Sequence, residues 1–282
     1  MKIFGFCLLF LFTAAPHAAE FLYIHGDVSP GGDSPSGGEP FHQMLLTDTG
    51  RRGMSVFREI VESKGHTIRQ QLDRETELTA ESLENIDVII FGLHQKRWSE
   101  SERDALHDWL VQGGSMIIYS DSATGGHWGQ VGAQNPVGQT VVNNLIRRYG
   151  MEVTVDQANG VRAVRPPPNP THPIVADRPV LEGEGVSLFA VSPYHPGEIL
   201  IPYVNDPEVV VSGTPTIPHK QNITIENPDW AALVRMPVGE GQIFGVFDRQ
   251  PFWNAGEGSD ITKRDNRLIL ERLVDAVGGS RE

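Results

Sequence analysis

The sequence predicts an α/β fold with a doubly wound, mostly parallel sheet. Apolar runs alternate with amphipathic helical patterns through the first half of the chain, which is typical of strand–helix–strand units with right-handed crossovers. Two of these runs, at residues 85–93 and 115–121, have uninterrupted apolar centres, VIIFGL and MII, as do strands buried on both faces of a parallel sheet. Later strands are shorter and separated by turns, so we expect extra C-terminal strands beside the parallel ones.

The first elements follow in order along the chain. Residues 21–27 predict a strand, and the stretch SPGGDSPSGGEP after it predicts a long loop, since its Gly, Pro and Ser residues do not sustain regular structure. A helix is predicted over residues 54–63, because its apolar residues share one face. The segment 66–72 predicts a second strand, and 85–93 a third.

A second helix is predicted to begin after Ser99, where the sequence SESE matches a capping box. It ends at Gly113 and Gly114, and the next buried strand runs over 115–121. A helix over 139–149 ends at Gly150, and the Pro-rich connector RPPPNPTHP follows. The remaining predicted elements are a helix over 261–277 and short strands over 185–191, 198–204, 208–213, 230–236 and 241–248.

The first nineteen residues have the pattern of a secretory signal peptide. Lys2 supplies a positive charge, residues 3–12 form an apolar run too short to span a bilayer, and small residues follow up to Ala18 and Ala19. We therefore expect a signal peptide over 1–19 and a single domain over 20–282, exported to the periplasm or the cell exterior. Removal of this segment would also remove Cys7, the single cysteine of the chain.

The charge of the chain disfavours two classes of partner. The 282 residues carry 23 basic and 36 acidic side chains, a formal net charge of −13. Such a chain repels phosphate backbones and anionic lipid, so we expect no nucleic-acid partner and no membrane-surface role. After the first segment, no stretch reaches transmembrane length. The oligomeric state stays open.

Polar residues after the predicted strands are the candidates for a site, because ligands of open α/β sheets bind outside the carboxyl ends of the strands. Trp253 could stack on a sugar or pack in the core, and each aspartate could instead cap a turn. The candidate catalytic residues are Asp27, Asp121, Ser122, His127 and Asp248. The candidate ligand-binding residues are His25, Asp27, Ser122, His127, Trp128, Asp248, Trp253, Asn254 and Asp260.

Two familiar chemistries receive little support. Ser122 follows a buried strand, but the G-x-S-x-G pattern of a nucleophile elbow is missing. The histidines are scattered singly without zinc-site spacing, so we expect no metal site. The strand-end carboxylates of Asp27, Asp121 and Asp248 could still hold a hard divalent cation or act as acid and base. No cofactor is expected.

Three stretches together resemble a known superfamily. They are residues 87–121, from DVIIFGL to IIYSD, residues 143–153, NNLIRRYGMEV, and residues 239–277, which contain FDRQPFWNAGEGSD and KRDNR. Their order resembles the class I glutamine amidotransferase-like superfamily, whose fold is flavodoxin-like. Within it, the chain is most similar to the intraflagellar-transport and gliding-type domains and the DUF4350 group, with trehalose-utilisation-type domains more distant.

The departures from that superfamily exclude one activity. Class I amidotransferases need a cysteine nucleophile at the elbow and a His-x-Glu after a late strand. Here residues 120–122 read Ser-Asp-Ser and residues 248–250 read Asp-Arg-Gln, so thiolate attack on glutamine is excluded. Three functions remain: an accessory domain that binds a polar ligand, most plausibly a carbohydrate; a glycan hydrolase or lyase that uses strand-end Asp and His; and a structural partner domain in an envelope assembly.

Overall fold

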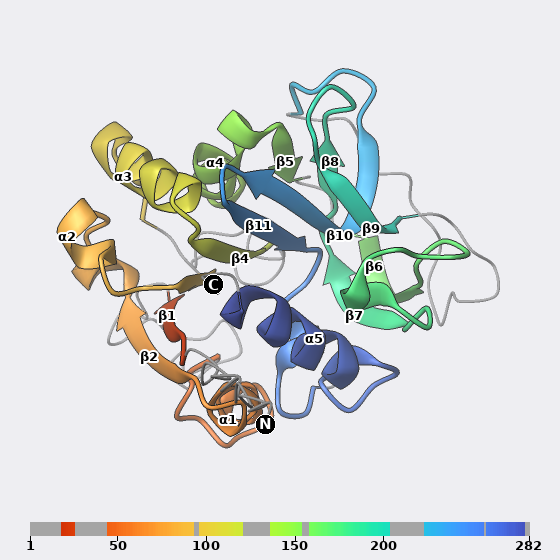
Figure 1. The fold of residues 1–282 in the computed structure, drawn as a ribbon. Coiled ribbons are helices and arrows are strands. Elements are labelled where there is room, and N and C mark those ends of the chain that lie inside the picture. Colours follow the sequence, from red (N-terminus) through yellow and green to blue (C-terminus); the bar gives the residue numbers. More distant parts are fainter. Residues whose placement is uncertain are drawn as a thin grey trace, which may run out of the picture.

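The structure is a computed structural model, and it describes residues 18–25, 44–92, 96–120, 136–153, 158–203, 223–256 and 258–279. Within these residues the main sheet has nine strands. Eight of them follow the order β2-β1-β3-β4-β11-β10-β8-β5, and β9 pairs with β10 (Figure 1). The bounds of these strands are β1 Glu20–His25, β2 Thr67–Leu72, β3 Val88–Phe91, β4 Ser115–Tyr119, β5 Met151–Val153, β8 Phe189–Val191, β9 Glu198–Pro202, β10 Asp229–Val238 and β11 Gly241–Val246.

The predicted parallel core is confirmed. Strand β1 pairs in parallel with β2 and β3, β3 pairs with β4, and β4 pairs with β11. The later strands are antiparallel: β10 pairs with β11, β8 and β9, and β8 pairs with β5. A separate antiparallel pair is formed by β6 (Ala158–Val164) and β7 (Leu181–Val186).

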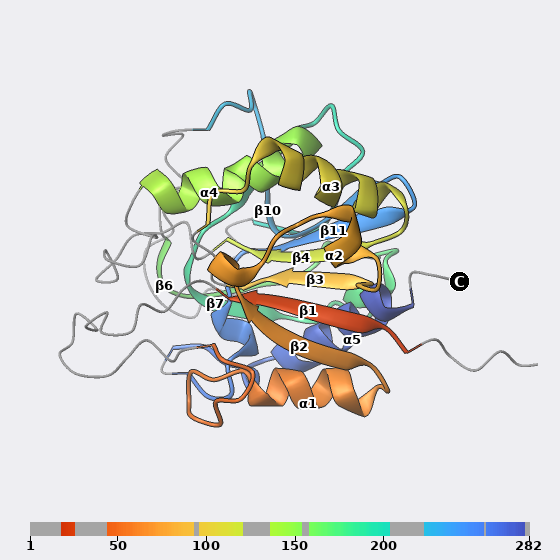
Figure 2. The ribbon, with the colours of Figure 1, turned by 90° about the vertical axis from the view of Figure 1, so that its left-hand side faces the viewer.

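Helices cover both faces of the sheet (Figure 2). One face packs against α1 (Ser55–Ser63) and α5 (Asn266–Gly278), and its core includes Phe21, Tyr23 and Phe244. The other face lies under α2 (Ala80–Leu83), α3 (Glu100–Val111) and α4 (Pro136–Ile146). The core under this face includes Leu22 and Ile24. Along a strand, successive residues belong to the two cores in turn, because side chains of a strand point to opposite faces with a period of two. Four 3₁₀ turns complete the described elements: η1 Asp73–Glu75, η3 Arg147–Tyr149, η4 Pro173–Val175 and η5 Gln250–Phe252.

The predicted start of α3 is confirmed in detail. The Ser99 side chain accepts a hydrogen bond from the Glu102 N–H, and the Glu102 carboxylate accepts one from the Ser99 N–H. Each bond pairs a backbone donor that the first turn of a helix leaves unsatisfied. None of the described helices is long and apolar enough to cross a membrane.

The last helix begins at Asn266, five residues later than predicted. Two features delay it. Arg264 has a φ of +47°, in the left-handed region that interrupts a right-handed helix. Asp260 also holds the preceding segment in a turn, since its carboxylate accepts hydrogen bonds from the N–H groups of Gly256 and Thr262. The apolar pattern that begins at Ile261 therefore includes residues of a loop.

Other predicted boundaries also move. Strand β6 was not expected, the predicted strand over 185–191 divides into the end of β7 and β8, and the predicted helix over 139–149 is α4 followed by η3. The short helix α2 was missed as well, although Thr79 and Ser82 form a capping box there. The predicted strand over 208–213 lies outside the described residues.

Candidate functional site

The carboxyl ends of the five parallel strands, β2, β1, β3, β4 and β11, form one edge of the sheet, on the left in Figure 2. The register pairs Ile24 with Phe91, Phe91 with Ile118, and Tyr119 with Val246. One residue further along, the register of β1 with β3 aligns His25 with Gly92, and the register of β3 with β4 aligns Gly92 with Tyr119. His25, Gly92, Tyr119 and Val246 thus form a row across the edge where ligands of this fold class bind.

Tyr23 places its phenol against the glycine of this row. A Cβ added to Gly92 would lie 2.4 Å from Tyr23 Oη, so the glycine makes room for the phenol. The Tyr23 and His25 rings lie side by side, with centroids 6.2 Å apart, as expected for residues i and i+2 of a strand. Tyr119 ends β4 on the same face, where its ring lies 5.5 Å from that of Phe252.

Both phenol side chains are buried, and the described residues offer neither hydroxyl a hydrogen bond. Tyr23 and Tyr119 are fully buried, and neither hydroxyl has a hydrogen-bond partner among the residues that the structure describes. Burial raises the pKa of Tyr23, although the Arg249 guanidinium opposes this, and burial together with Tyr23 raises the pKa of Tyr119. Both side chains therefore stay protonated and keep a hydroxyl proton to donate.

Two guanidinium groups lie beside the indole of Trp253. The centroid of the Trp253 ring is 5.8 Å from Cζ of Arg52 and 5.9 Å from Cζ of Arg249, which is cation–π distance. Trp253 is 4% exposed, and its indole N–H finds no acceptor in the described part of the chain. The edge thus carries the positive charges of Arg52 and Arg249. After the two phenols, the Trp253 indole is its third donor without an acceptor in the described residues.

Asp248 joins the end of β11 to β7. It is fully buried, and its carboxylate accepts hydrogen bonds from the N–H of Glu184, at 2.7 Å, and of Gln250, at 3.1 Å. Ser120, directly after β4, donates its hydroxyl to the carbonyls of Ser187 and Val246. Both side chains thereby hold strand ends in place.

Asn254 and Asp260 organise the loops behind this edge. The Asn254 amide donates to the carbonyls of Asp48 and Gly50 and accepts from the N–H of Val56, so it closes the loop that leads into α1. Asp260 forms the turn before α5 described above. Their polar atoms are satisfied by protein groups, which is the capping interpretation considered for such residues.

The predicted site residues divide into three groups. His25, Asp248 and Trp253 lie at the carboxyl edge, whereas Asn254 and Asp260 point into the supporting loops. The other candidates, Asp27, Asp121, Ser122, His127 and Trp128, lie outside the described residues, so a shared cleft stays a prediction. Among the residues that are described, no group of three or more His, Cys, Asp or Glu side chains could hold a metal ion.

Sequence reasoning missed the two tyrosines and gave Arg249 little weight. A signal for the tyrosines was present: FLYIH and MIIYS each carry one tyrosine in a mostly apolar run, within two residues of the strand end. A tyrosine at the end of a buried strand brings a polar hydroxyl to the edge of the sheet. Its contact with Gly92 depends on the pairing of β1 with β3, which is a tertiary feature.

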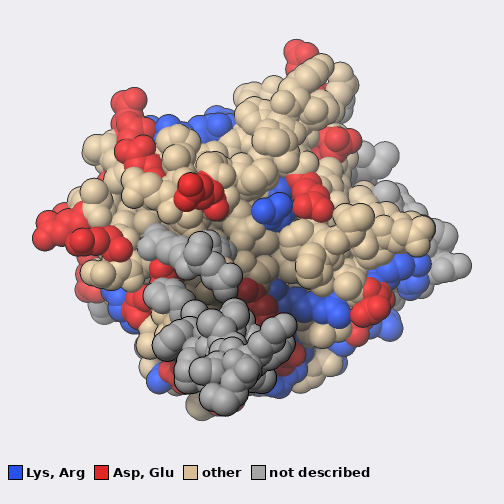
Figure 3. All heavy atoms as spheres, viewed as in Figure 1, with Lys and Arg blue, Asp and Glu red and all other residues tan. Residues whose placement is uncertain are grey.

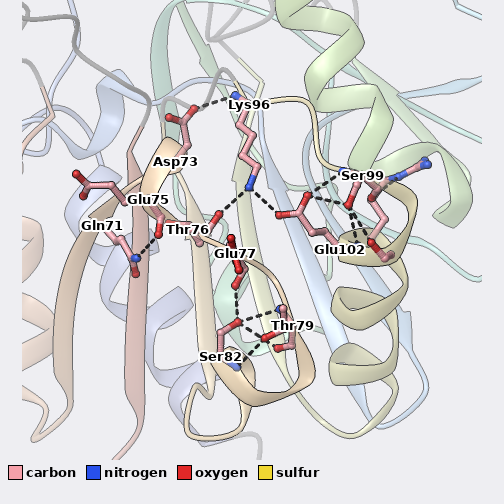
Figure 4. A network of polar contacts seen from close by, with 12 residues as sticks. Gln71, Asp73, Glu75, Thr76, Glu77, Thr79, Ser82, Lys96, Ser99 and Glu102 are labelled. Atoms are coloured by element: carbon pink, nitrogen blue, oxygen red, sulfur yellow. Dashed lines mark hydrogen bonds and ion pairs between the residues drawn. The ribbon is translucent and has the colours of Figure 1, made fainter.

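A second polar network lies at the carboxyl ends of β2 and β3 (Figure 4). The Lys96 ammonium donates to the Thr76 carbonyl and to the Glu102 carboxylate, each at 2.7 Å, and the Lys96 N–H donates to Asp73. Burial favours a raised pKa for Glu102, but hydrogen bonds from Lys96 and Ser99 outweigh it and lower the pKa. The bonds are made within the protein, so this network supports the edge and leaves no open site.

Comparisons with known proteins support the fold. The N-terminal domain of mmIFT52 superposes with a TM-score of 0.57 and 12% identity, over 92% of this chain and 97% of that one. The cytoplasmic protein STM1381 from Salmonella typhimurium LT2 gives 0.55 and 12%, over 92% and 99%. The chain has the class I glutamine amidotransferase-like fold. At this identity the likeness concerns fold alone. No protein-family model and no curated protein matches the sequence.

Proposed function

We propose that the chain is an exported domain without glutaminase activity that binds a carbohydrate at the carboxyl edge of its parallel strands. We also infer that it falls in the intraflagellar-transport and gliding-type branch of the fold. The observation that carries the binding proposal is the pair of buried phenol hydroxyls, on Tyr23 and Tyr119, that have no partner in the described part of the chain. An unpaired buried polar group costs about 1–3 kcal/mol, a cost that a ligand can recover.

The chemistry of the edge specifies what the ligand offers. The two phenols and the Trp253 indole are donors, and the carboxylate of Asp248 already accepts two backbone N–H groups. A ligand that fits must therefore present acceptors, as the ring and hydroxyl oxygens of a sugar do. Arg52 and Arg249 beside Trp253 favour a sugar that also carries a carboxylate.

The proposed absence of glutaminase activity is inferred from the missing cysteine nucleophile. Cys7 is the single cysteine in 282 residues and precedes the first strand of the sheet by thirteen positions. The residues after β4 and β11 supply serine, aspartate, arginine and glutamine in place of the cysteine and histidine that the amidotransferase reaction needs.

Export is proposed from the leader pattern and its position relative to β1. That strand begins at Glu20, directly after the expected cleavage region, and the Ala19 N–H already donates to Nδ1 of His66. N-terminal sequencing of the protein purified from the periplasm or medium should start between Ala19 and Phe21. A start at Met1 would contradict export through this leader.

The binding proposal is tested by thermal shift with galactose and galacturonate oligomers, using wild type, Tyr23→Phe and Tyr119→Phe. Wild type should gain roughly 3 kcal/mol of stability at a hundredfold excess of ligand over Kd, more readily with the acidic sugar. Both variants should lose this gain. Tyr194→Phe, at a tyrosine that is 91% exposed, is the matched control and should keep it.

The same variants separate a ligand site from a purely structural role. Since neither hydroxyl has a partner among the described residues, its removal should leave the free energy of unfolding without ligand unchanged or higher by about 1 kcal/mol. A sugar-induced shift that survives both substitutions, or no shift with either sugar, would refute the proposed function.

A further inference from the structure

The helix layer over one face of the sheet contains a groove between α2 and α3. It has a volume of about 650 Å³. Its α2 side is formed by Ala80, Leu83 and Glu84, and its α3 side by one face of the helix at spacings of three and four residues: Ser101, Asp104, Ala105, Asp108, Trp109 and Gln112.

The groove exists because the β2–β3 crossover contains too little helix. A crossover between parallel strands usually places a full helix on the sheet. Here α2 has four residues, about 6 Å of helix, whereas its neighbour α3 has twelve, about 18 Å. Most of the facing side of α3 therefore has no neighbouring helix from this crossover, although both helices lie on the same side of the sheet (Figure 2).

The floor of the groove is apolar and fixed. Leu83 and Trp109 are 2% and 6% exposed. The Trp109 indole donates to the Ile86 carbonyl at 2.7 Å, and its ring packs so closely on Gly114 that an added Cβ there would lie 2.4 Å away. A partner would meet this surface already formed, without a cost for ordering it.

The rim is acidic on both sides. Glu84 lies on the α2 side and Asp104 and Asp108 on the α3 side, all exposed. Asp104 pairs with Arg148 at 2.8 Å, whereas Glu84 and Asp108 have no ion pair within the described residues. Figure 3 shows acidic side chains gathered on the left of the molecule, over α2 and α3.

The negative field of the rim reaches a neighbouring buried group. Burial raises the pKa of Tyr149 to about 12; Arg148 opposes this rise, and Asp104 and Asp108 add to it. Since Arg148 neutralises one carboxylate of the three, an occupant of the groove would meet excess negative charge.

We propose that this groove binds a basic amphipathic helix of a partner protein. The partner helix would lay its apolar face on Ala105 and on the part of Trp109 that reaches the surface, and its lysine or arginine side chains would pair with Glu84 and Asp108. It would complete the helix layer at the place where the β2–β3 crossover is short. This surface is separate from the carboxyl edge, so the inference is independent of the proposed carbohydrate site.

The test uses a fluorescently labelled synthetic helix of about 14 residues, with leucines on one face and lysines along both flanks. Fluorescence anisotropy with the full-length mature protein should give saturable binding that weakens as salt is added. A peptide with glutamate in place of every lysine should bind at least tenfold more weakly.

Two variants locate the binding. Glu84→Gln with Asp108→Asn removes the two carboxylates without an ion pair and should weaken binding about fivefold. The matched control, Glu59→Gln with Glu226→Gln, removes two exposed charges, one on α1 and one before β10, away from the groove, and should bind as wild type does. Ala105→Phe should weaken binding by filling the groove, with no change in charge.

Three results would overturn the proposal. The first is no saturable binding of the lysine peptide up to about 1 mM. The second is equal binding by the rim variant and its control, which would assign the attraction to net charge. The third is undiminished binding by Ala105→Phe, which would place the peptide elsewhere.

Discussion

The hydroxyl of Tyr23 lies where a side chain on Gly92 would begin. An added Cβ would be 2.4 Å from Tyr23 Oη and 2.6 Å from Cζ. Two neighbouring strands, β1 and β3, are thereby fitted to each other at the edge that carries the candidate site. The glycine is needed for space, because its neighbour in the sheet already fills its side-chain position.

Gly92→Ala should therefore destabilise the protein. Overpacking of this kind costs about 1–3 kcal/mol of the free energy of unfolding, which urea denaturation would measure. Gly279→Ala is the control, since its Cβ would meet a single atom, the Asp275 carbonyl oxygen, at an ordinary 3.5 Å. In the Tyr23→Phe background, Gly92→Ala should cost less stability than it does in wild type, because the closest atom of the clash is gone. Additive losses would mean that the two residues do not press on each other.

Asn254→Ala should release the loop that leads into α1. The two N–H bonds of its amide are shared among three oxygens, on Asp48, Gly50 and Ser55, and its carbonyl oxygen accepts from the Val56 N–H. Their loss should cost about 2 kcal/mol and speed hydrogen exchange at the Val56 N–H.

Asn254→Asp separates the two roles of this amide. The aspartate keeps an acceptor for Val56 and loses the donors, so exchange at Val56 should stay slow while stability falls. Fast exchange at Val56 in the aspartate variant would show that the donor bonds alone order the loop.

The protein should lose stability in alkali through Tyr149. Burial raises its folded pKa to about 12, from an ordinary value of 10.0. The neutral phenol is thus favoured in the folded state, and its contribution is complete below pH 10 and is lost as the pH rises towards 12. Urea titrations from about pH 9 to about pH 12 should show a shallower decline for Tyr149→Phe than for wild type. Parallel curves would contradict this assignment.

His172 should destabilise the protein in acid. Burial lowers its pKa, Glu198 opposes the shift and Arg235 adds to it. Its Nδ1 also accepts a hydrogen bond from the Ile174 N–H, which a protonated ring cannot do.

The neutral form of His172 is therefore favoured in the folded state. Its contribution to stability is present above the ordinary pKa of 6.5 and is lost as the pH falls through the lower folded value. His172→Asn cannot titrate but keeps an acceptor, so its free energy of unfolding should change less between about pH 7 and about pH 5. An identical change in wild type and variant would refute the assignment.

The parallel core could be predicted from the sequence because its determinants are local. Apolar runs such as 85–93 and 115–121 leave few alternatives to buried strands, and the Ser99 capping box marks its helix within one residue. The late start of α5 could not be predicted, because it depends on the backbone of Arg264 and on the turn that Asp260 closes. The pattern of apolar residues is the same with or without these features.

The sequence could predict at which edge of the sheet the candidate residues lie, but it could not predict which of their polar atoms form hydrogen bonds within the protein. The position of His25, Asp248 and Trp253 at the strand ends follows from topology. Which polar atoms remain unpaired depends on contacts between segments far apart in the chain, such as Asp248 with the Glu184 N–H. That is why Asn254, Asp260 and Asp248 carry structural hydrogen bonds, while the Tyr23 and Tyr119 hydroxyls find no partner among the described residues.

The strand order places the last strand of the chain in the interior of the sheet. Strand β11, at Gly241–Val246, lies between β4 and β10, so until it emerges β4 has an open hydrogen-bonding edge. Synthesis must therefore proceed through some 240 residues before the central ladder can close. Such late closure slows folding and exposes a strand edge to other chains. A nascent chain with this strand order keeps β4 open to other chains until its last strand has been made, so binding by a chaperone during synthesis would be advantageous.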